Sequence, residues 1–239
     1  MPTWLGGRGF ASRYGVNMAI EMIFWDNDGV LVETEPLYFQ ATCEVFAELG
    51  VTLSRQDYEE TYLRDNRGAW HLLGDCAADL NWLEAQRLRR NARYTELLHA
   101  NSTVCPGAEA VLAALYPSTR MAVVTSSRGE HFEAIHETTG FRRFFEFVLV
   151  REDYAQSKPD PESYLLALRR SGCPPASALV IEDSPRGLAA ATAAGLRCWV
   201  IPSTLTLTEN ADWAAADRVL GSITEIPALL KSAPLNPQQ

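Results

Sequence analysis

The chain lacks most of the features that mark exported, membrane-bound or nucleic-acid-binding proteins. Its five cysteines are odd in number and scattered, with no CxxC pair, so they indicate neither a disulfide framework nor a zinc motif. No apolar run approaches the ~18 residues of a membrane-spanning helix. Lysine and arginine total 21 against 30 aspartates and glutamates, and this balance opposes binding to a phosphate backbone. We therefore expect a cytoplasmic protein with reduced, mostly buried thiols and with neither a membrane nor a nucleic-acid partner.

The two ends of the chain carry few structural signals. Residues 1–17 contain no continuous apolar stretch of the kind found in signal peptides, and we predict a disordered leader. The tail, residues 232–239, is also predicted to be disordered. The 239 residues are enough for one large domain, or for a domain that carries a smaller insert.

Short apolar segments alternate with helical patterns over much of the chain. The predicted strands are 22–26, 121–125, 146–150, 178–182, 197–201 and, more weakly, 217–220. The predicted helices between them are 107–115, 130–139, 160–171 and 185–194. Continuous apolar strands suit a parallel sheet that is covered on both faces. The alternation predicts an α/β fold with a doubly wound, Rossmann-like parallel sheet, which binds ligands beyond the carboxyl ends of its strands.

A segment with no strand pattern interrupts this alternation. Residues 36–103 show helical patterns near 36–49, 54–64, 67–78 and 82–99, with Gly50 as a helix stop and Ser54 as an N-cap. We predict an all-helical cap over 36–103, inserted into an α/β core formed by 18–35 and 104–231.

Two aspartates follow the first predicted strand. Asp26 and Asp28 are separated by one residue, and Gly29 comes next. Alternate residues of a strand point the same way, so the two carboxylates are expected on one face. At ~4 Å they repel by roughly 4 kcal/mol with an effective dielectric constant of about 20, so a cation or a proton is needed between them. An EF-hand calcium loop is disfavoured because Leu31 stands where that loop needs glycine.

Three further groups of polar residues end or follow later strands. They are Thr125-Ser126-Ser127, Lys158 within SKPDP, and Glu182-Asp183 followed by Ser184-Pro185. Taken singly, each has an ordinary interpretation as a helix cap, a solvated lysine or an acidic turn. Asp160-Pro161 is predicted to begin a helix, with Asp160 as the N-cap. Adjacent carboxylates on a strand point to opposite faces, so at most one of Glu182 and Asp183 is expected to bind a metal directly.

In this order, the four motifs resemble those of the haloacid-dehalogenase-like hydrolase superfamily. The insert further resembles that of subfamily I members with a helical C1 cap, among them phosphoglycolate phosphatases and β-phosphoglucomutases. The resemblance implies that Asp26 is a nucleophile that forms an aspartyl-phosphate, and that Asp28 is the general acid and base. Thr125, with the neighbouring Ser126 and Ser127, and Lys158 would bind the phosphoryl group.

The same resemblance implies a Mg²⁺ cofactor. Its ligands would be Asp26, the backbone carbonyl of Asp28 and Asp183, with Glu182 as a companion, and oxygen ligands are those that Mg²⁺ prefers. The chain departs from the family pattern at two positions beside the first aspartate. Trp25 replaces the usual phenylalanine, and Asn27 replaces an apolar residue, although its backbone can still contact phosphate.

The predicted cap is expected to select the substrate. It contains six arginines, at positions 64, 67, 87, 89, 90 and 93. A solvated helix face is the ordinary explanation for them, and the functional one is that Arg67 and Arg90 bind an anionic sugar or carboxylate when the cap closes. The four histidines show no ligand spacing and are interpreted as surface or packed residues.

These patterns favour a Mg²⁺-dependent phosphatase that hydrolyses a small phosphorylated metabolite, a sugar phosphate or phosphoglycolate. The enzyme is expected to be a monomer or a weak homodimer. The alternative is a β-phosphoglucomutase-like phosphosugar mutase, which Tyr38 disfavours because mutases carry histidine four residues after the hinge threonine, here Thr34. A phospho-acceptor receiver domain is disfavoured by the chain length and the insert, and a catalytically silent binding protein by the complete set of motifs.

Overall fold

The structure is a computed structural model of the 239-residue chain. It describes residues 19–64, 67–101, 103–203 and 212–232. The predicted leader 1–17 and the tail beyond Ser232 lie outside the described residues. No helix in the described part of the chain is long and apolar enough to cross a membrane.

Six parallel strands form one sheet in the order β3-β2-β1-β4-β5-β6. The strands are β1 (Met22–Trp25), β2 (Arg120–Val124), β3 (Val148–Leu149), β4 (Ala178–Glu182), β5 (Arg197–Val200) and β6 (Arg218–Val219). The predicted doubly wound α/β fold is therefore confirmed. Strand β1 lies between β2 and β4, so loops from three neighbouring strands meet at one end of the sheet, where such folds bind ligands.

The apolar run of β1 reflects burial on both faces of the sheet. All four of its side chains are fully buried. Ile23 and Trp25 pack into one hydrophobic cluster, and Met22 and Phe24 pack into another on the opposite face. A strand covered on both sides has no solvent-exposed face, and this explains why polar residues appear only after Trp25.

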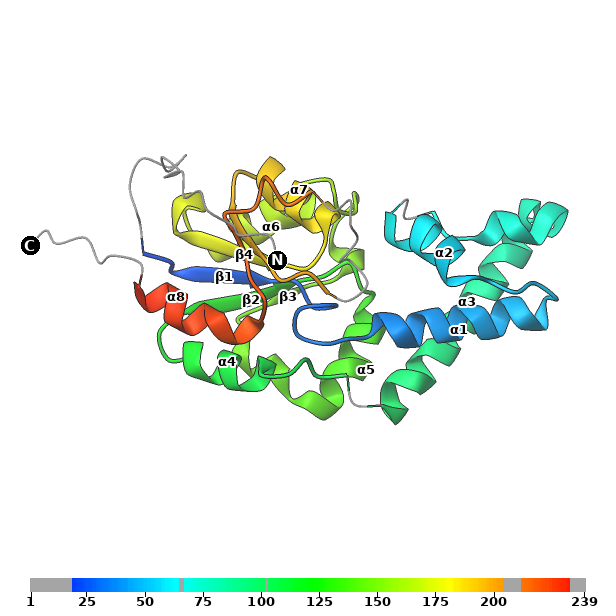
Figure 1. Cartoon of the computed structure of the whole chain (residues 1–239), viewed down its shortest axis with the longest axis horizontal. Helices are drawn as coiled ribbons and strands as arrows, with labels where there is room; N and C mark the ends of the chain where they lie inside the picture. Colours follow the sequence, from blue (N-terminus) through cyan, green and yellow to red (C-terminus); the bar gives the residue numbers. More distant parts are fainter. Residues whose placement is uncertain (1–18, 65–66, 102, 204–211, 233–239) are drawn as a thin grey trace, which may run out of the picture.

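Helices cover both faces of the sheet (Figure 1). In that view α6 (Glu162–Ser171) and α7 (Pro185–Ala193) lie above it, and α4 (Ala108–Leu115), α5 (Gly129–Thr139) and α8 (Ile226–Ser232) lie below it. Helix α6 begins two residues later than predicted. Asp160 still accepts a hydrogen bond from the Glu162 N–H at 2.9 Å, but Pro161 already has helical backbone angles and takes the N-cap position. Short 3₁₀ turns lie at Phe141–Phe144, Arg151–Asp153, Pro175–Ser177 and Ile223–Glu225.

Residues 35–100, which lie between β1 and α4 in the chain, extend from one end of the sheet (Figure 1). We call residues 35–100 the helical segment; its division from the core as a separate domain stays a prediction. Its elements are α1 (Glu35–Glu48), α2 (Arg55–Tyr58), a π-helical turn Glu59–Arg64, 3₁₀ turns over Trp70–Ala78, and α3 (Leu80–Ala100).

Two details of the helical segment differ from the predicted helices. The predicted helix over 54–64 is α-helical only to Tyr58, although Ser54 does cap it by accepting the Asp57 N–H at 3.1 Å. The predicted helix over 67–78 is instead a pair of 3₁₀ turns, because Gly74 takes a positive φ of 62° that a continuous helix cannot contain. Both differences are local changes of helix type.

All five cysteines are free thiols. Cys173 and Cys198 are buried, but Cys43 and Cys105 are only half-buried and Cys76 is exposed. The expectation that the thiols are mostly buried is therefore wrong, and the three that are not fully buried lie on the helical segment or in the connection that leads from it.

Candidate active site

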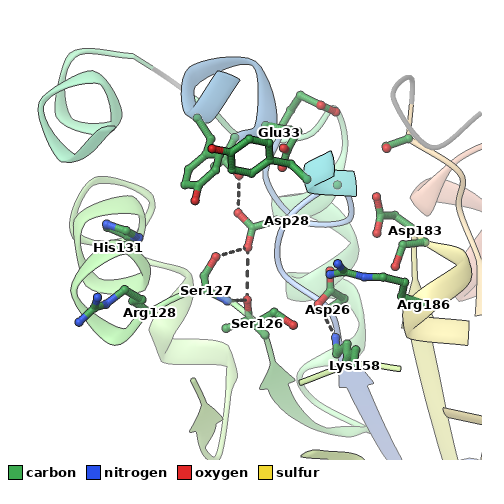
Figure 2. Close-up of a pocket in the computed structure, with 18 of the residues that line it drawn as sticks. Asp26, Asp28, Glu33, Ser126, Ser127, Arg128, His131, Lys158, Asp183 and Arg186 are labelled. Atoms are coloured by element: carbon green, nitrogen blue, oxygen red, sulfur yellow. Dashed lines mark hydrogen bonds and ion pairs between the residues drawn. The ribbon is translucent and has the colours of Figure 1, made fainter. Parts of the chain in front are cut away.

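Connections that follow β1, β2, β3 and β4 bring the predicted catalytic residues together (Figure 2). The Asp26 N–H continues the pairing of β1 with β4 by donating to the Ile181 carbonyl at 2.9 Å. The chain then turns at Gly29, whose φ is 84°. A Cβ atom on Gly29 would collide with the Asp183 carboxylate, so glycine is needed here for both conformation and space.

Lys158 joins the first and fourth motifs. Its Nζ donates to Asp26 Oδ1 and to Glu182 Oε1, both at 2.7 Å, and to the Val124 carbonyl at 2.9 Å. The side chain is only 4% exposed. Burial by itself would lower the pKa of Lys158, but the negative charges of Asp26 and Glu182 outweigh it and raise the pKa, so the ammonium stays charged.

Asp26 is held in a strongly desolvated position. Burial raises the pKa of Asp26 to about 7, against the opposing effect of the Lys158 charge. The nearby carboxylates of Glu182 and Asp28 raise it further. One lysine therefore does not fully compensate the negative charge that collects at the end of the sheet.

Glu182 and Asp183 both reach this acidic cluster. One carboxylate oxygen from each of Asp26, Glu182 and Asp183 lies within 4.8 Å of the others, and all three residues are buried. Burial raises the pKa of Asp183, and the charges of Asp26 and Glu182 add to the effect. The expectation that the adjacent carboxylates point to opposite faces is wrong, because β4 ends at Glu182 and the strand alternation does not extend to Asp183.

The Asp28 carboxylate lies apart from this cluster and is surrounded by hydroxyl donors. Its Oδ2 accepts from Ser127 Oγ at 2.7 Å and from Thr125 Oγ1 at 3.2 Å, and Thr34 Oγ1 donates to its Oδ1. The Ser127 N–H in turn donates to Thr125 Oγ1 at 2.9 Å. Thr125 and Ser127 thus hold Asp28, while Ser126 lines the cavity beside them (Figure 2). The Asp28 side chain is outside the three-carboxylate cluster, and a metal contact through its backbone carbonyl stays a prediction.

A cavity of about 990 Å³ lies between the end of the sheet and the helical segment. Arg90 on α3 lines it and is only 7% exposed. The Arg90 guanidinium lies over the Tyr38 ring, 4.6 Å from its centroid, and donates to Asn91 Oδ1 at 2.9 Å. No carboxylate in the described part of the chain is within ion-pair distance of Arg90. This arrangement provides a buried positive charge for an anion in the cavity.

Two predicted substrate-binding residues do not line the cavity. Arg67 is exposed and lies outside its wall. The Asn27 side chain is fully buried and is directed toward His136 on α5, with Oδ1 2.8 Å from Nε2. Any contact of Asn27 with a ligand would therefore use its backbone.

Several cavity residues were not predicted from the sequence. Glu33 and Glu35 follow the first motif, Arg186 begins α7, and His131 lies on α5. His131 is 4% exposed and packs edge-on against Tyr94 of α3. Glu33, Glu35 and Arg186 lie within a few residues of recognised motifs, and this proximity was a usable signal. His131 had none, because its position depends on how α5 packs against α3.

Comparisons with known proteins agree with this geometry. A family model described as haloacid dehalogenase-like hydrolase matches residues 23–201. Protein CbbY of Cereibacter sphaeroides is 35% identical over 222 residues, covering 88% of this chain and 95% of that protein. Hexitol phosphatase B of Escherichia coli strain K12 is 29% identical, covering 85% of this chain and 93% of that protein.

A solved structure of CbbY from Rhodobacter sphaeroides, a variant in complex with xylulose-(1,5)bisphosphate, is also similar. The TM-score is 0.74 at 31% sequence identity, and the match covers 86% of this chain and 96% of that one. The likeness spans both the sheet and the helical segment.

Proposed function

The chain belongs to the haloacid dehalogenase-like hydrolase family and is a phosphatase, and we propose that it hydrolyses a small sugar phosphate with the help of Mg²⁺. The observation that carries the proposal is the meeting of Asp26, Lys158 and the Glu182-Asp183 pair, with Asp28 held beside them by separate donors. These groups come from three distant segments of the chain. Their convergence provides a nucleophile, a proton carrier and a cation site in one cavity.

The acidic cluster fits a divalent cation. Three buried carboxylates lie within 4.8 Å of one another, and Lys158 supplies a single positive charge to them. Asp26 and Asp183 would be ligands, with Glu182 as their companion, and such oxygen ligands suit Mg²⁺. When bound, Mg²⁺ would supply Lewis-acid stabilisation of the phosphoryl oxygens.

The first chemical step transfers the phosphoryl group to the protein. A carboxylate oxygen of Asp26 attacks phosphorus, and the bond between phosphorus and the sugar oxygen breaks. Asp28, in its protonated form, gives its proton to that oxygen, so the sugar leaves as an alcohol. Lys158 stays charged beside Asp26 and offsets negative charge on the phosphoryl oxygens.

The second step releases phosphate. Asp28, now a carboxylate, takes a proton from water, and the resulting oxygen attacks phosphorus. The bond between phosphorus and Asp26 breaks, which restores the Asp26 carboxylate, and Asp28 keeps the proton that it took from water and is ready to act as the acid again. The three hydroxyl donors around Asp28 hold its carboxylate in place for this step.

Arg90 supports a substrate that carries a second anionic group. Its guanidinium is buried in the cavity wall with no carboxylate partner in the described ranges of the chain, while Glu33 and Glu35 offer oxygen acceptors to sugar hydroxyls. The structural relative in complex with xylulose-(1,5)bisphosphate supports a sugar bisphosphate as the first compound to examine. A cytoplasmic location, and a monomeric or weakly dimeric state, complete the proposal.

The phosphosugar mutase stays as the alternative function. Tyr38 lies beneath the Arg90 guanidinium at the position where histidine is expected in mutases. Incubation with a glucose 1-phosphate and a bisphosphate primer separates the two functions. Isomerisation without net release of phosphate supports the mutase, and phosphate release supports the phosphatase.

The decisive experiment measures phosphate release from a panel of sugar phosphates, with Mg²⁺ and after chelation. We expect turnover only with the cation, and at least a ~10³-fold loss of kcat in Asp26→Asn, because the amide is a far weaker nucleophile. Turnover that survives both chelation and Asp26→Asn contradicts the proposal. Glu109→Gln, an exposed substitution on α4, is the control and is expected to behave as the parent.

A further inference from the structure

A buried chain of hydrogen bonds runs from helix α5 to the Asp28 carboxylate. His136 Nδ1 lies 2.8 Å from Thr139 Oγ1, and His136 Nε2 lies 2.8 Å from Asn27 Oδ1. At the other end of the amide, Asn27 Nδ2 donates to Asp28 Oδ2 at 3.3 Å. The chain thus connects a helix on the lower face of the sheet to the first catalytic loop.

The partners define the direction of each bond. Because Asn27 Nδ2 donates to a carboxylate, Oδ1 is the acceptor that faces His136, and Nε2 must carry the hydrogen. Thr139 Oγ1 accepts from the Phe141 N–H at 3.2 Å, which leaves its own hydroxyl hydrogen for His136 Nδ1. Every hydrogen therefore points toward Asp28. Burial lowers the pKa of His136 to about 4, in accord with a neutral ring.

The side chains of Asn27 and His136 do not form part of the cavity wall. Asn27 is fully buried, His136 is 4% exposed, and neither one lines the cavity. The backbone of Asn27 is already fixed, because its carbonyl accepts the N–H groups of Leu31 and Val32 at 2.9 and 3.1 Å. A buried amide destabilises a protein unless its polar atoms are paired, so an apolar side chain would serve packing alone equally well.

We propose that Asn27 and His136 are positioning residues that fix the orientation of the Asp28 carboxylate for proton transfer. His136 aligns the amide of Asn27, and that amide holds Oδ2 of Asp28. The inference rests on the proposed function, in which Asp28 is the general acid and base. It adds two residues that act on the reaction without touching the substrate.

The test compares two leaving groups. An alkyl phosphate such as a sugar phosphate needs a proton from Asp28 when its bond to phosphorus breaks, whereas p-nitrophenyl phosphate releases a stable anion and does not. In His136→Phe, which keeps an aromatic ring but loses the donor, we expect kcat/KM for the sugar phosphate to fall about tenfold, with little change for p-nitrophenyl phosphate. His136→Gln retains an N–H at the position of Nε2 and is expected to restore most of the lost rate.

Asn27→Leu provides a second, independent route to the same result. It removes the donor to Asp28 and is expected to lower kcat/KM selectively for the sugar phosphate. In that background His136→Phe should have no further effect, because the two residues act through one contact. Glu133→Gln, exposed on the same helix, is the control. Thermal unfolding of each variant shows whether it is folded, and if His136→Phe is not, Asn27→Leu carries the test.

The outcomes separate this inference from the proposed function. If the parent enzyme is inactive on both substrates, or Asp26→Asn keeps full turnover, the proposed function fails. If the parent is an active phosphatase but His136→Phe and Asn27→Leu lose equal fractions of kcat/KM on both substrates, or lose none, the positioning role is wrong. Independent losses that multiply in the double variant contradict it as well.

Discussion

The end of the sheet and the helical segment use charge in opposite ways. At the end of the sheet, Lys158, Asp26 and Glu182 are buried and paired with one another across distant parts of the chain. On the helical segment, Arg89 and Arg93 form exposed ion pairs with glutamates of α1, whereas Arg90 is buried and has no carboxylate partner among the residues that the structure describes. Exposed pairs contribute little free energy, whereas buried charges are costly to leave unpaired. The comparison suggests that reaction chemistry lies in the first region and selection of the substrate in the second.

Removal of the buried positive charge of Lys158 is the strongest test of this difference between the two regions. Lys158→Met leaves Asp26 and Glu182 buried without their partner. We expect kcat to fall by about 10²–10³-fold and the free energy of unfolding to fall by about 3 kcal/mol. Phosphate-release kinetics and denaturant titration measure the two effects. Lys231→Met, at the exposed second lysine of the chain, is the control. A Lys158→Met variant with the kcat of the parent would show that the core charges are structural only.

Replacement of Arg90 on the helical segment by methionine should weaken substrate binding without changing the chemical step. Arg90→Met is expected to raise KM for a sugar bisphosphate about tenfold or more, since a hydrogen bond to a charged group contributes roughly 1.5–3 kcal/mol. KM for p-nitrophenyl phosphate, which carries no second anionic group, should stay as in the parent. Arg89→Met, one residue earlier and exposed, is the matched control. Equal changes in KM for the two substrates would remove the distinction between the regions.

The smallest expected effect concerns histidines in the two regions. His136 has a pKa of about 4 when folded, below the ordinary value of 6.5, because it is buried. Between these values the unfolded chain binds the additional proton, so this contribution to stability is present above pH 6.5 and is lost as the pH falls toward 4. We expect about 1 kcal/mol of loss between pH 6.5 and 5.5 in the parent that is missing in His136→Gln.

Denaturant titrations at the two pH values measure this difference. His99→Gln, at an exposed ring on α3, is the control substitution on the helical segment. An identical pH dependence in His136→Gln and the parent would mean that the ring is protonated in the folded protein. Nε2 would still donate to Asn27, but Nδ1 would then donate to Thr139, and the direction of that bond would need revision.

Local patterns were sufficient to predict where the six strands lie along the chain. Strands β1, β2 and β4 are short buried apolar runs, and each is followed at once by polar residues that reach the cavity, because a strand covered on both faces admits polar groups only where it ends. The helical segment was less predictable in detail. Gly74 and the π-helical turn after Tyr58 change the type of helix without changing the apolar pattern.

The contacts within the candidate active site were likewise not predictable from local sequence patterns. The alternation rule assigned Glu182 and Asp183 to opposite faces, but the strand ends between them and both carboxylates reach Asp26. Asn27 was recognised as an unusual residue, yet nothing in the sequence indicates that its partner is His136, which lies 109 positions away. His131 and His136 were interpreted only as surface or packed side chains, since their spacing matches no ligand motif.

The amino-acid sequence by itself determined the α/β class, the motifs and the strand ends that carry them, because these follow from the chemistry of residues that are neighbours along the chain. The tertiary structure alone decided which charges are paired, which arginine is buried in the cavity wall, and which histidine is linked to Asp28 by hydrogen bonds through Asn27. Hydrogen bonds and ion pairs act over about 3 Å in space, and residues 132 positions apart, such as Asp26 and Lys158, come within that distance only once the sheet has formed.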